Sequence, residues 1–279
     1  MAARHSHLLF FTSVLALLAP LLALHIENLE RLKANLDEIT NLHSDEPHPD
    51  GDGANMQQSR ASNPQQIEHR SWPKDCSEVS AGSPSGIYVI QPTGLHPIVV
   101  YCEMNVTDGG WTVIQRNRQS TEITWAESWS TYKYGFGNVH TEYWLGTEYI
   151  HQISKQKVYQ VRFVIWDAAN NITFADYNLF SLEDESHGYR LRLGTYSGLA
   201  GDAMTLNSAS SVHDNMKFSA KDLDQDTYSG NCASSYGGGW WYSACYSVRL
   251  NVKGGLTWGS LCNGNCQASA ILIKPASYC

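Results

Sequence analysis

The chain has 279 residues, 42% hydrophobic and 11% aromatic, so it can bury one substantial core with length left over. Its 27 acidic and 19 basic side chains give a formal net charge of −8, and Lys and Arg form no basic run. This charge pattern excludes nucleic acid as an expected partner.

Residues 1–23 are predicted to be a secretory signal peptide. Arg4 precedes an apolar run from Leu8 to Leu22, and the small residue Ala23 follows at the expected cleavage position. The alternative is a membrane anchor. However, polar residues and a proline interrupt the run, which is shorter than the roughly 20 residues of a spanning helix. No later stretch is apolar enough to insert into a membrane, so we expect a protein secreted into the extracellular space.

Residues 24–43 are predicted to form a short amphipathic helix. Apolar side chains recur there at helical spacing, at Leu29, Leu32, Leu36 and Ile39. The pattern spans about two heptads, fewer than a coiled coil usually needs. Two interpretations stay open: weak homo-oligomerisation through residues 26–42, or a frayed remnant.

Residues 44–72 are rich in Pro, Asp, Gln, Ser, Asn and Gly and hold almost no large apolar side chain, which predicts a flexible linker. A globular domain follows over residues 73–279. Strand signals cover residues 86–91, 98–103, 111–117, 158–165, 171–177 and 189–193, and helical signals cover 125–132 and 147–152. We expect an antiparallel sheet with a few small helices, then a loop-dominated lobe from about Thr195 onward.

Two N-glycosylation acceptors lie in this domain, at Asn105 and Asn171, each followed two positions later by Thr. Because the chain is expected to be secreted, both are predicted sites of glycosylation.

No catalytic motif is present: the sequence contains no GxSxG, HExxH or P-loop. The pair His213-Asp214 resembles a general base with its partner, but no nucleophile motif accompanies it. We therefore expect no catalytic residues and no enzymatic activity.

The acidic stretch Asp222-Leu-Asp224-Gln-Asp226 suggests a site for a hard cation. Alternating aspartates place their carboxylates on one side of a short loop, where a cation relieves their repulsion. An EF-hand begins in the same way but needs Gly at its sixth position and Glu at its twelfth, which are Thr227 and Ala233 here. The alternative is a solvated acidic turn.

All seven cysteines lie in the C-terminal part, as in proteins of oxidising compartments. Cys262 and Cys266 flank an Asn-Gly-Asn turn, which predicts a short-loop disulfide between them; a structural zinc site is the alternative. Cys279 is then left over, either as a free thiol or as an intermolecular bridge that joins two copies of the chain.

The segment from Phe218 to Cys245 resembles the calcium loop and cysteine pair of the fibrinogen C-terminal domain family. It contains Phe-Ser, the three aspartates, Gly-Asn-Cys-Ala, Trp240-Trp241 and the second cysteine at the family's spacing. Further motifs of the family precede it, among them Gly86-Ile-Tyr, Tyr101-Cys-Glu-Met, Gly109-Gly-Trp-Thr-Val-Ile-Gln-Arg116 and Glu142-Tyr-Trp-Leu-Gly146. The resemblance covers about Pro73 to Cys279 and is closest to the family's vertebrate fibrinogen-like-1-like branch.

The resemblance implies an α+β fold with three lobes: a small N-terminal disulfide lobe, a central antiparallel sheet lobe with short helices, and an irregular calcium-binding lobe. It implies the disulfides Cys76–Cys102 and Cys232–Cys245. It also implies Ca²⁺ as a bound ion, with the carboxylates of Asp224 and Asp226 and the backbone carbonyls of Tyr228 and Gly230 as ligands. Asp222 would add charge from outside the coordination shell.

Lectins of this family hold acetyl groups in a pocket beside a cis peptide, which maps onto Ala244-Cys245. The resemblance places Tyr236, Ala244, Cys245 and Tyr246 around such a pocket. The chain departs from the family there, because Tyr246 replaces a common histidine and the segment after Asn251 is shorter than usual. An alternative interpretation is that Tyr236, Trp240 and Trp241 are simply packed core.

These features favour a secreted, calcium-stabilised, non-enzymatic recognition glycoprotein that binds a cell-surface receptor or an extracellular matrix component. The second hypothesis is an innate-immune lectin for acetylated carbohydrates.

Overall fold

The computed structural model describes residues 71–206 and 211–276. The signal peptide, the amphipathic helix, Cys279 and all but the last two residues of the linker lie outside the described residues, so the expectations about them stay predictions. No helix within the described ranges has the length and apolar character needed to cross a membrane.

The first lobe is a hairpin held by a disulfide. The 3₁₀ helix η1 (Cys76–Glu78) precedes strands β1 (Gly86–Ile90) and β2 (Ile98–Glu103), which pair antiparallel. The predicted disulfide Cys76–Cys102 joins η1 to β2. The buried carboxylate of Asp75 caps η1 and accepts a hydrogen bond from the Tyr159 hydroxyl (2.5 Å), which attaches this lobe to the central sheet.

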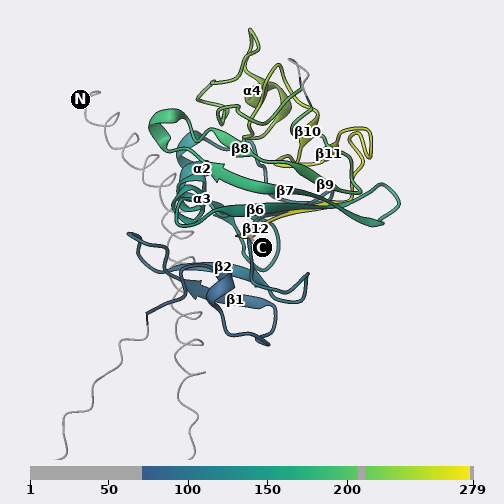
Figure 1. Ribbon diagram of the computed structural model, residues 1–279. Coiled ribbons are helices and arrows are strands. Elements are labelled where there is room, and N and C mark those ends of the chain that lie inside the picture. Colours follow the sequence, from purple (N-terminus) through teal and green to yellow (C-terminus); the bar gives the residue numbers. More distant parts are fainter. Residues whose placement is uncertain (1–70, 207–210, 277–279) are drawn as a thin grey trace, which may run out of the picture. The chain divides into compact units, whose positions relative to one another are not determined.

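One antiparallel sheet forms the centre of the domain (Figure 1). Its main path runs β1-β2-β3-β12-β6-β7-β8; off this path, β5 pairs with β3 and β4, and β9 pairs with β7. The strands after β2 are β3 (Trp111–Arg118), β4 (Phe136–Gly137), β5 (Tyr143–Trp144), β6 (Tyr159–Trp166), β7 (Ile172–Leu182), β8 (Leu191–Leu193), β9 (Tyr196–Gly198) and β12 (Ala268–Pro275). In β6 every second residue is buried, so one face of that strand packs into the core.

Strand β12 corrects one expectation. Residues from about Thr195 onward were expected to be loop-dominated, but residues 268–275 return to the centre of the sheet, between β3 and β6. Five consecutive residues of β12 are buried, as a strand covered on both faces requires. The apolar run in this segment is therefore a central strand.

Two short helices pack beside the sheet, α2 (Trp129–Tyr134) and α3 (Thr147–Ser154), and the 3₁₀ helix η2 (Glu185–His187) follows β7. Helix α2 begins later than the helical signal at residues 125–132. Trp125 has a φ of 57°, which a right-handed helix does not contain, and the helix starts after the N-cap Ser128. Helix α3 begins where the pattern places it and ends two residues later.

The remaining lobe is mostly irregular, as expected, and contains helix α4 (Cys232–Tyr236) and the strand pair β10 (Val248–Arg249) and β11 (Thr257–Trp258) (Figure 1). A buried aromatic cluster attaches it to the rest of the domain. The ring of Phe218 lies 5.2 Å from that of Tyr132, 5.8 Å from Trp144 and 5.3 Å from Trp241. Because such rings bury large apolar areas, they hold this lobe firmly against the sheet.

Candidate functional site

The acidic loop folds around the carboxylate of Asp226. Its Oδ1 accepts the backbone N–H of Tyr228 and its Oδ2 that of Cys232, both at 2.9 Å. Asp224 Oδ1 accepts the N–H of Asp226 at 3.2 Å. The two carboxylates predicted to bind calcium are therefore neighbours on one tight loop.

The electrostatics of this loop suit a cation. Burial of the Asp226 carboxyl and the nearby charge of Asp224 raise the pKa of Asp226, although two backbone N–H groups favour its ionised form. The donor set contains only oxygen, as a hard cation prefers. Within the described residues, the carbonyl oxygens of Tyr228 and Gly230 accept no hydrogen bond, which leaves them free to bind an ion or water.

The proposed set has only two charged ligands. Consistent with this, no group of three or more His, Cys, Asp and Glu side chains suited to a metal occurs in the described ranges. Calcium sites of extracellular modules bind weakly and rely on backbone carbonyls and water for part of their coordination. The residues present therefore fit such a site, and its occupation by Ca²⁺ stays a proposal.

The first aspartate of the repeat has a separate role that sequence reasoning missed. Asp222 Oδ1 accepts the backbone N–H of Trp129 at 2.7 Å, in the first turn of α2. That N–H has no partner within the helix, and a carboxylate is favourable at a helix N-terminus. Asp222 thus ties the acidic loop to α2, a contact that no local pattern indicates because the partners are far apart in the sequence.

The predicted cysteine pair lies in the segment that follows the acidic loop. Cys232 and Cys245 form a disulfide, and the peptide bond between Ala244 and Cys245 is cis. Asn231 caps α4 by accepting the N–H of Ser234 (2.8 Å), and the carbonyl of Ser243 accepts the N–H of Thr227 (3.1 Å). The acidic loop, α4 and the second cysteine are therefore joined by covalent and hydrogen bonds.

Two of the predicted pocket residues contact each other. The rings of Tyr236 and Tyr246 meet edge to face with centroids 4.9 Å apart. The Arg249 guanidinium lies 4.9 Å from the Tyr246 ring centroid and 5.7 Å from that of Tyr236. Tyr236 remains 39% exposed, whereas Trp240 and Trp241 are buried, so the packed-core interpretation applies to the tryptophans.

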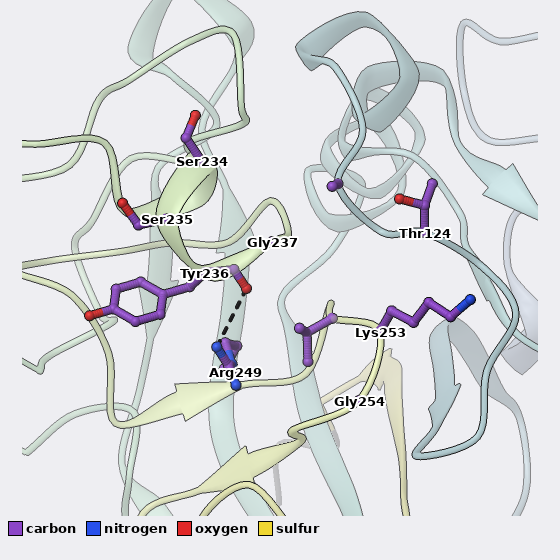
Figure 2. A pocket seen from close by; sticks show the side chains of 10 residues that line it. Thr124, Ser234, Ser235, Tyr236, Gly237, Arg249, Lys253 and Gly254 are labelled. Carbon is purple, nitrogen blue, oxygen red and sulfur yellow. Dashed lines mark hydrogen bonds between the residues drawn. The ribbon is translucent and has the colours of Figure 1, made fainter.

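An open cleft of about 490 Å³ lies between α4, the loop of residues 121–127 and the turn of residues 250–255 (Figure 2). We call it the α4 cleft. Its lining is Thr124, Ala126, Ser234, Ser235, Tyr236, Gly237, Arg249, Val252, Lys253 and Gly254. Of the four residues expected around an acetyl pocket, only Tyr236 lines it; Ala244, Cys245 and Tyr246 do not. Sequence reasoning did not single out Arg249 or Lys253.

His213 is a fully buried structural residue in the same lobe. Its Nδ1 lies 2.8 Å from the carbonyl oxygen of Trp241, and its Nε2 accepts the N–H groups of Ser247 (3.1 Å) and Val248 (2.9 Å). The proton is therefore on Nδ1, where it donates to Trp241. Burial lowers the pKa of His213 to about 4, since the charged ring would lack solvent.

The remaining predicted positions are also in place. Cys262 and Cys266 form the third disulfide, as expected from their turn, in place of the alternative zinc site. Asn105 and Asn171 are exposed, on the turn after β2 and in the turn before β7. The side-chain amide of Asn171 donates to Asp167 Oδ2 (3.0 Å). Both asparagines are accessible, and their glycosylation stays a prediction.

The sequence matches the family described as "Fibrinogen beta and gamma chains, C-terminal globular domain" over residues 72–266. The chicken (Gallus gallus) "Fibrinogen-like protein 1-like protein" is 55% identical over 192 residues, which are 68% of this chain and 68% of that protein.

Two solved structures share the fold. The "Fibrinogen-like globe domain of human ANGPTL6" has a TM-score of 0.67 and 36% sequence identity, and the match covers 74% of this chain and 96% of that one. Lamprey fibrin D-dimer, complexed with the peptide ligand Gly-His-Arg-Pro-amide, has a TM-score of 0.69 and 26% identity. That match covers 99% of this chain and 92% of the lamprey chain.

Proposed function

Because the chain belongs to the fibrinogen C-terminal domain family, whose members are not enzymes, we propose that it is a secreted, calcium-stabilised recognition glycoprotein. Its partner is a cell-surface receptor or an extracellular matrix component, which it binds through the fibrinogen-like domain. The family, its fibrinogen-like-1-like branch and the α+β fold, all expected from the motifs, are confirmed.

One observation carries the proposal: the segments around α4 are joined to one another and to α2 by a disulfide and hydrogen bonds. The Cys232–Cys245 disulfide, the Asp226 hydrogen bonds and the Asp222 contact with α2 hold the irregular segments of this lobe in one arrangement. A rigid surface loses little conformational entropy when it binds a partner, which favours affinity. The lamprey relative, which holds a short peptide, shows that the fold can present a ligand-binding surface.

The second candidate is a lectin for acetylated carbohydrates. The 39% exposure of the Tyr236 ring beside the cysteine pair favours it, because an acetyl methyl group packs well on an aromatic ring. The contact between Tyr236 and Tyr246 weakens this candidate, since the two rings fill space against each other. Receptor or matrix recognition is therefore the better supported function.

Two binding assays separate the candidates. The secreted full-length chain is passed over immobilised N-acetylglucosamine with calcium, followed by elution with acetate or chelator, and is also incubated with cultured cells and their deposited matrix. Flow-through on the sugar resin with saturable binding to cells or matrix supports recognition of a receptor or matrix component. Retention on the resin with specific elution by acetate supports the lectin, and absence of binding in both assays contradicts both functions.

A further inference from the structure

A smaller cavity of about 240 Å³ is lined by residues of β2, β4 and β5, the end of α2 and the middle of α3. We call it the β4 pocket. Its wall contains Val99 of β2, Tyr134 of α2, Phe136 of β4 and Tyr149 of α3. Every lining residue is aliphatic, aromatic or glycine, so the pocket contains no charged side chain.

The apolar wall of the β4 pocket is accessible to solvent. Val99 is 46% exposed and Tyr134 57% exposed, and the side chains of Phe136, Val139 and Tyr149 are half-buried. A concave apolar surface of this kind is typical of a binding site. Its volume is smaller than the roughly 300–1,000 Å³ of sites that hold whole small molecules, and therefore suits one apolar side chain.

Arg116 of β3 lies at the edge of this pocket. It pairs across the sheet with Tyr143, which lines the pocket, and paired residues share a face of the sheet. The Arg116 guanidinium carbon also lies 4.3 Å from the ring centroid of Tyr101. Tyr101 is two residues after Val99 on β2, so these two side chains point to the same side. Two strands therefore place the guanidinium beside the pocket.

Arg116 is held in place by neutral groups. Its Nη1 donates to the carbonyl oxygen of His140 (3.4 Å), the residue after Val139 of the pocket wall, and it forms no ion pair within the described residues. Burial raises the pKa of the Tyr143 hydroxyl, and the positive charge of Arg116 partly opposes that increase. The charge of Arg116 thus acts on the pocket and remains available to an anionic partner.

These groups suit a peptide better than a sugar. Tyrosine hydroxyls are the pocket's polar side-chain groups, whereas a sugar needs several hydrogen-bonding partners. Protein partners, in contrast, often insert one apolar side chain into such a pocket. An extended peptide spaces alternate side chains by roughly 6.6 Å, which is also the spacing of Val99 and Tyr101 along β2. An apolar side chain in the pocket would therefore place a residue two positions away beside Arg116.

We propose that the β4 pocket binds a segment of a partner protein that carries an apolar side chain and a carboxylate two residues apart. The apolar side chain enters the pocket, and the carboxylate pairs with the guanidinium of Arg116. The acidic character of the partner follows from charge complementarity, because Arg116 is the cation at the pocket edge. The inference names a docking surface for the partner and rests on the proposed function.

The test measures binding of the full-length chain to peptide conjugates by biolayer interferometry. Each conjugate carries many copies of one peptide on the same polymer, so that weak binding can be measured. The probe is Gly-Ser-Phe-Ser-Glu-Ser-Gly, and Gly-Ser-Glu-Ser-Phe-Ser-Gly covers the opposite chain direction. Control peptides replace Phe with Ala or Glu with Gln. We expect each replacement to weaken binding about tenfold or more, since each removes one of the two interactions.

The variants assign that binding to the β4 pocket. Arg116→Gln should weaken binding of the Glu probe about tenfold and leave binding of the Gln probe unchanged, a difference that a merely structural role would not produce. Val99→Glu should weaken binding of both, because it removes part of the apolar wall. The matched controls are Arg192→Gln and Val158→Glu, exposed positions that do not line the pocket. Thermal unfolding verifies that each variant is folded. If Arg116→Gln does not fold, the Glu and Gln probes on the natural chain and Val99→Glu decide.

Four results would overturn the inference: no binding of any probe, equal binding of the Phe and Ala probes, equal binding of the Glu and Gln probes, or equal losses in Val99→Glu and Val158→Glu. Binding to cells or matrix separates this failure from that of the proposed function. If the chain binds cells or matrix but no probe, only the docking surface is wrong. If it binds neither, the proposed function fails too.

Discussion

His213 shows how a residue with a catalytic appearance can be structural. The pair His213-Asp214 suggests a general base, but every polar atom of the His213 ring contacts the backbone. Asp214 accepts the N–H of Leu193 (2.8 Å). The ring joins Trp241 to the start of β10, and its neutral form is the one that accepts both N–H groups there. Protonation of Nε2 would remove that acceptor, so acid should destabilise this lobe.

The stability of the domain should therefore depend on pH in a defined window. The pKa of His213 is about 4 in the folded state and about 6.5 when unfolded, so the unfolded chain binds one more proton between these values. The free energy of unfolding should fall by up to about 3 kcal/mol as the pH drops through this window, with no further loss from this group below it. Urea unfolding at a series of pH values measures the change.

Two variants assign this pH dependence. His213→Gln should be less stable at neutral pH but lose less stability on acidification, because the group that titrates is gone. His140→Gln changes an exposed histidine and should retain the dependence of the natural chain. An unchanged pH slope in His213→Gln would show that another group is responsible.

At the scale of elements, the acidic loop divides its three aspartates between two tasks. Asp224 and Asp226 are adjacent carboxylates with unbonded backbone carbonyls after them, whereas Asp222 contacts the first turn of α2. Under the proposal of a bound Ca²⁺, the first pair depends on the cation for its stability, and the Asp222 contact does not. Their contributions to stability can therefore be separated by varying calcium.

Calcium at millimolar concentration should raise the melting temperature of the natural chain by a few degrees. At 1 mM calcium, binding to the folded state at a dissociation constant of about 0.1–1 mM contributes about 0.4–1.4 kcal/mol. The double variant Asp224→Asn with Asp226→Asn should lose this calcium-dependent increase, as measured by calorimetry with calcium and with chelator. Equal increases in the natural chain and the double variant would show that Asp224 and Asp226 do not bind calcium.

Asp222→Asn serves as the matched control within the same loop. It retains a side-chain oxygen that can accept the N–H of Trp129 but removes the negative charge at the N-terminus of α2, which should lower stability by about 0.3–1 kcal/mol. Because that contact needs no cation, the loss should be similar with calcium and with chelator. A loss seen only with calcium would place Asp222 among the metal ligands.

At the scale of the whole molecule, the cysteines bear on assembly. The three disulfides use six of the seven cysteines, and Cys279 lies outside the described residues. An odd cysteine in a secreted chain often pairs with another chain. We expect a non-reducing gel to show a dimer band that reductant or Cys279→Ser converts to monomer. A monomer band alone would mean that Cys279 is free or capped, and residues 26–42 would then be the remaining candidate for self-association.

The sequence by itself determined the features that depend on neighbours along the chain. The alternation of Asp222, Asp224 and Asp226, the turn between Cys262 and Cys266 and most strand positions are local, because side-chain spacing and turn chemistry act over a few residues. The family motifs extended the prediction to the fold and to the pairing of Cys232 with Cys245.

Only the tertiary structure decided which distant segments meet. The central position of β12, the contact between Asp222 and α2 and the α4 cleft each join segments far apart in the sequence. Arg249, Lys253 and Thr124 line one cleft although Thr124 belongs to the loop of residues 121–127, more than a hundred residues earlier in the sequence. Such pairings depend on the burial and hydrogen bonding of the whole domain, so no spacing within one segment predicts them.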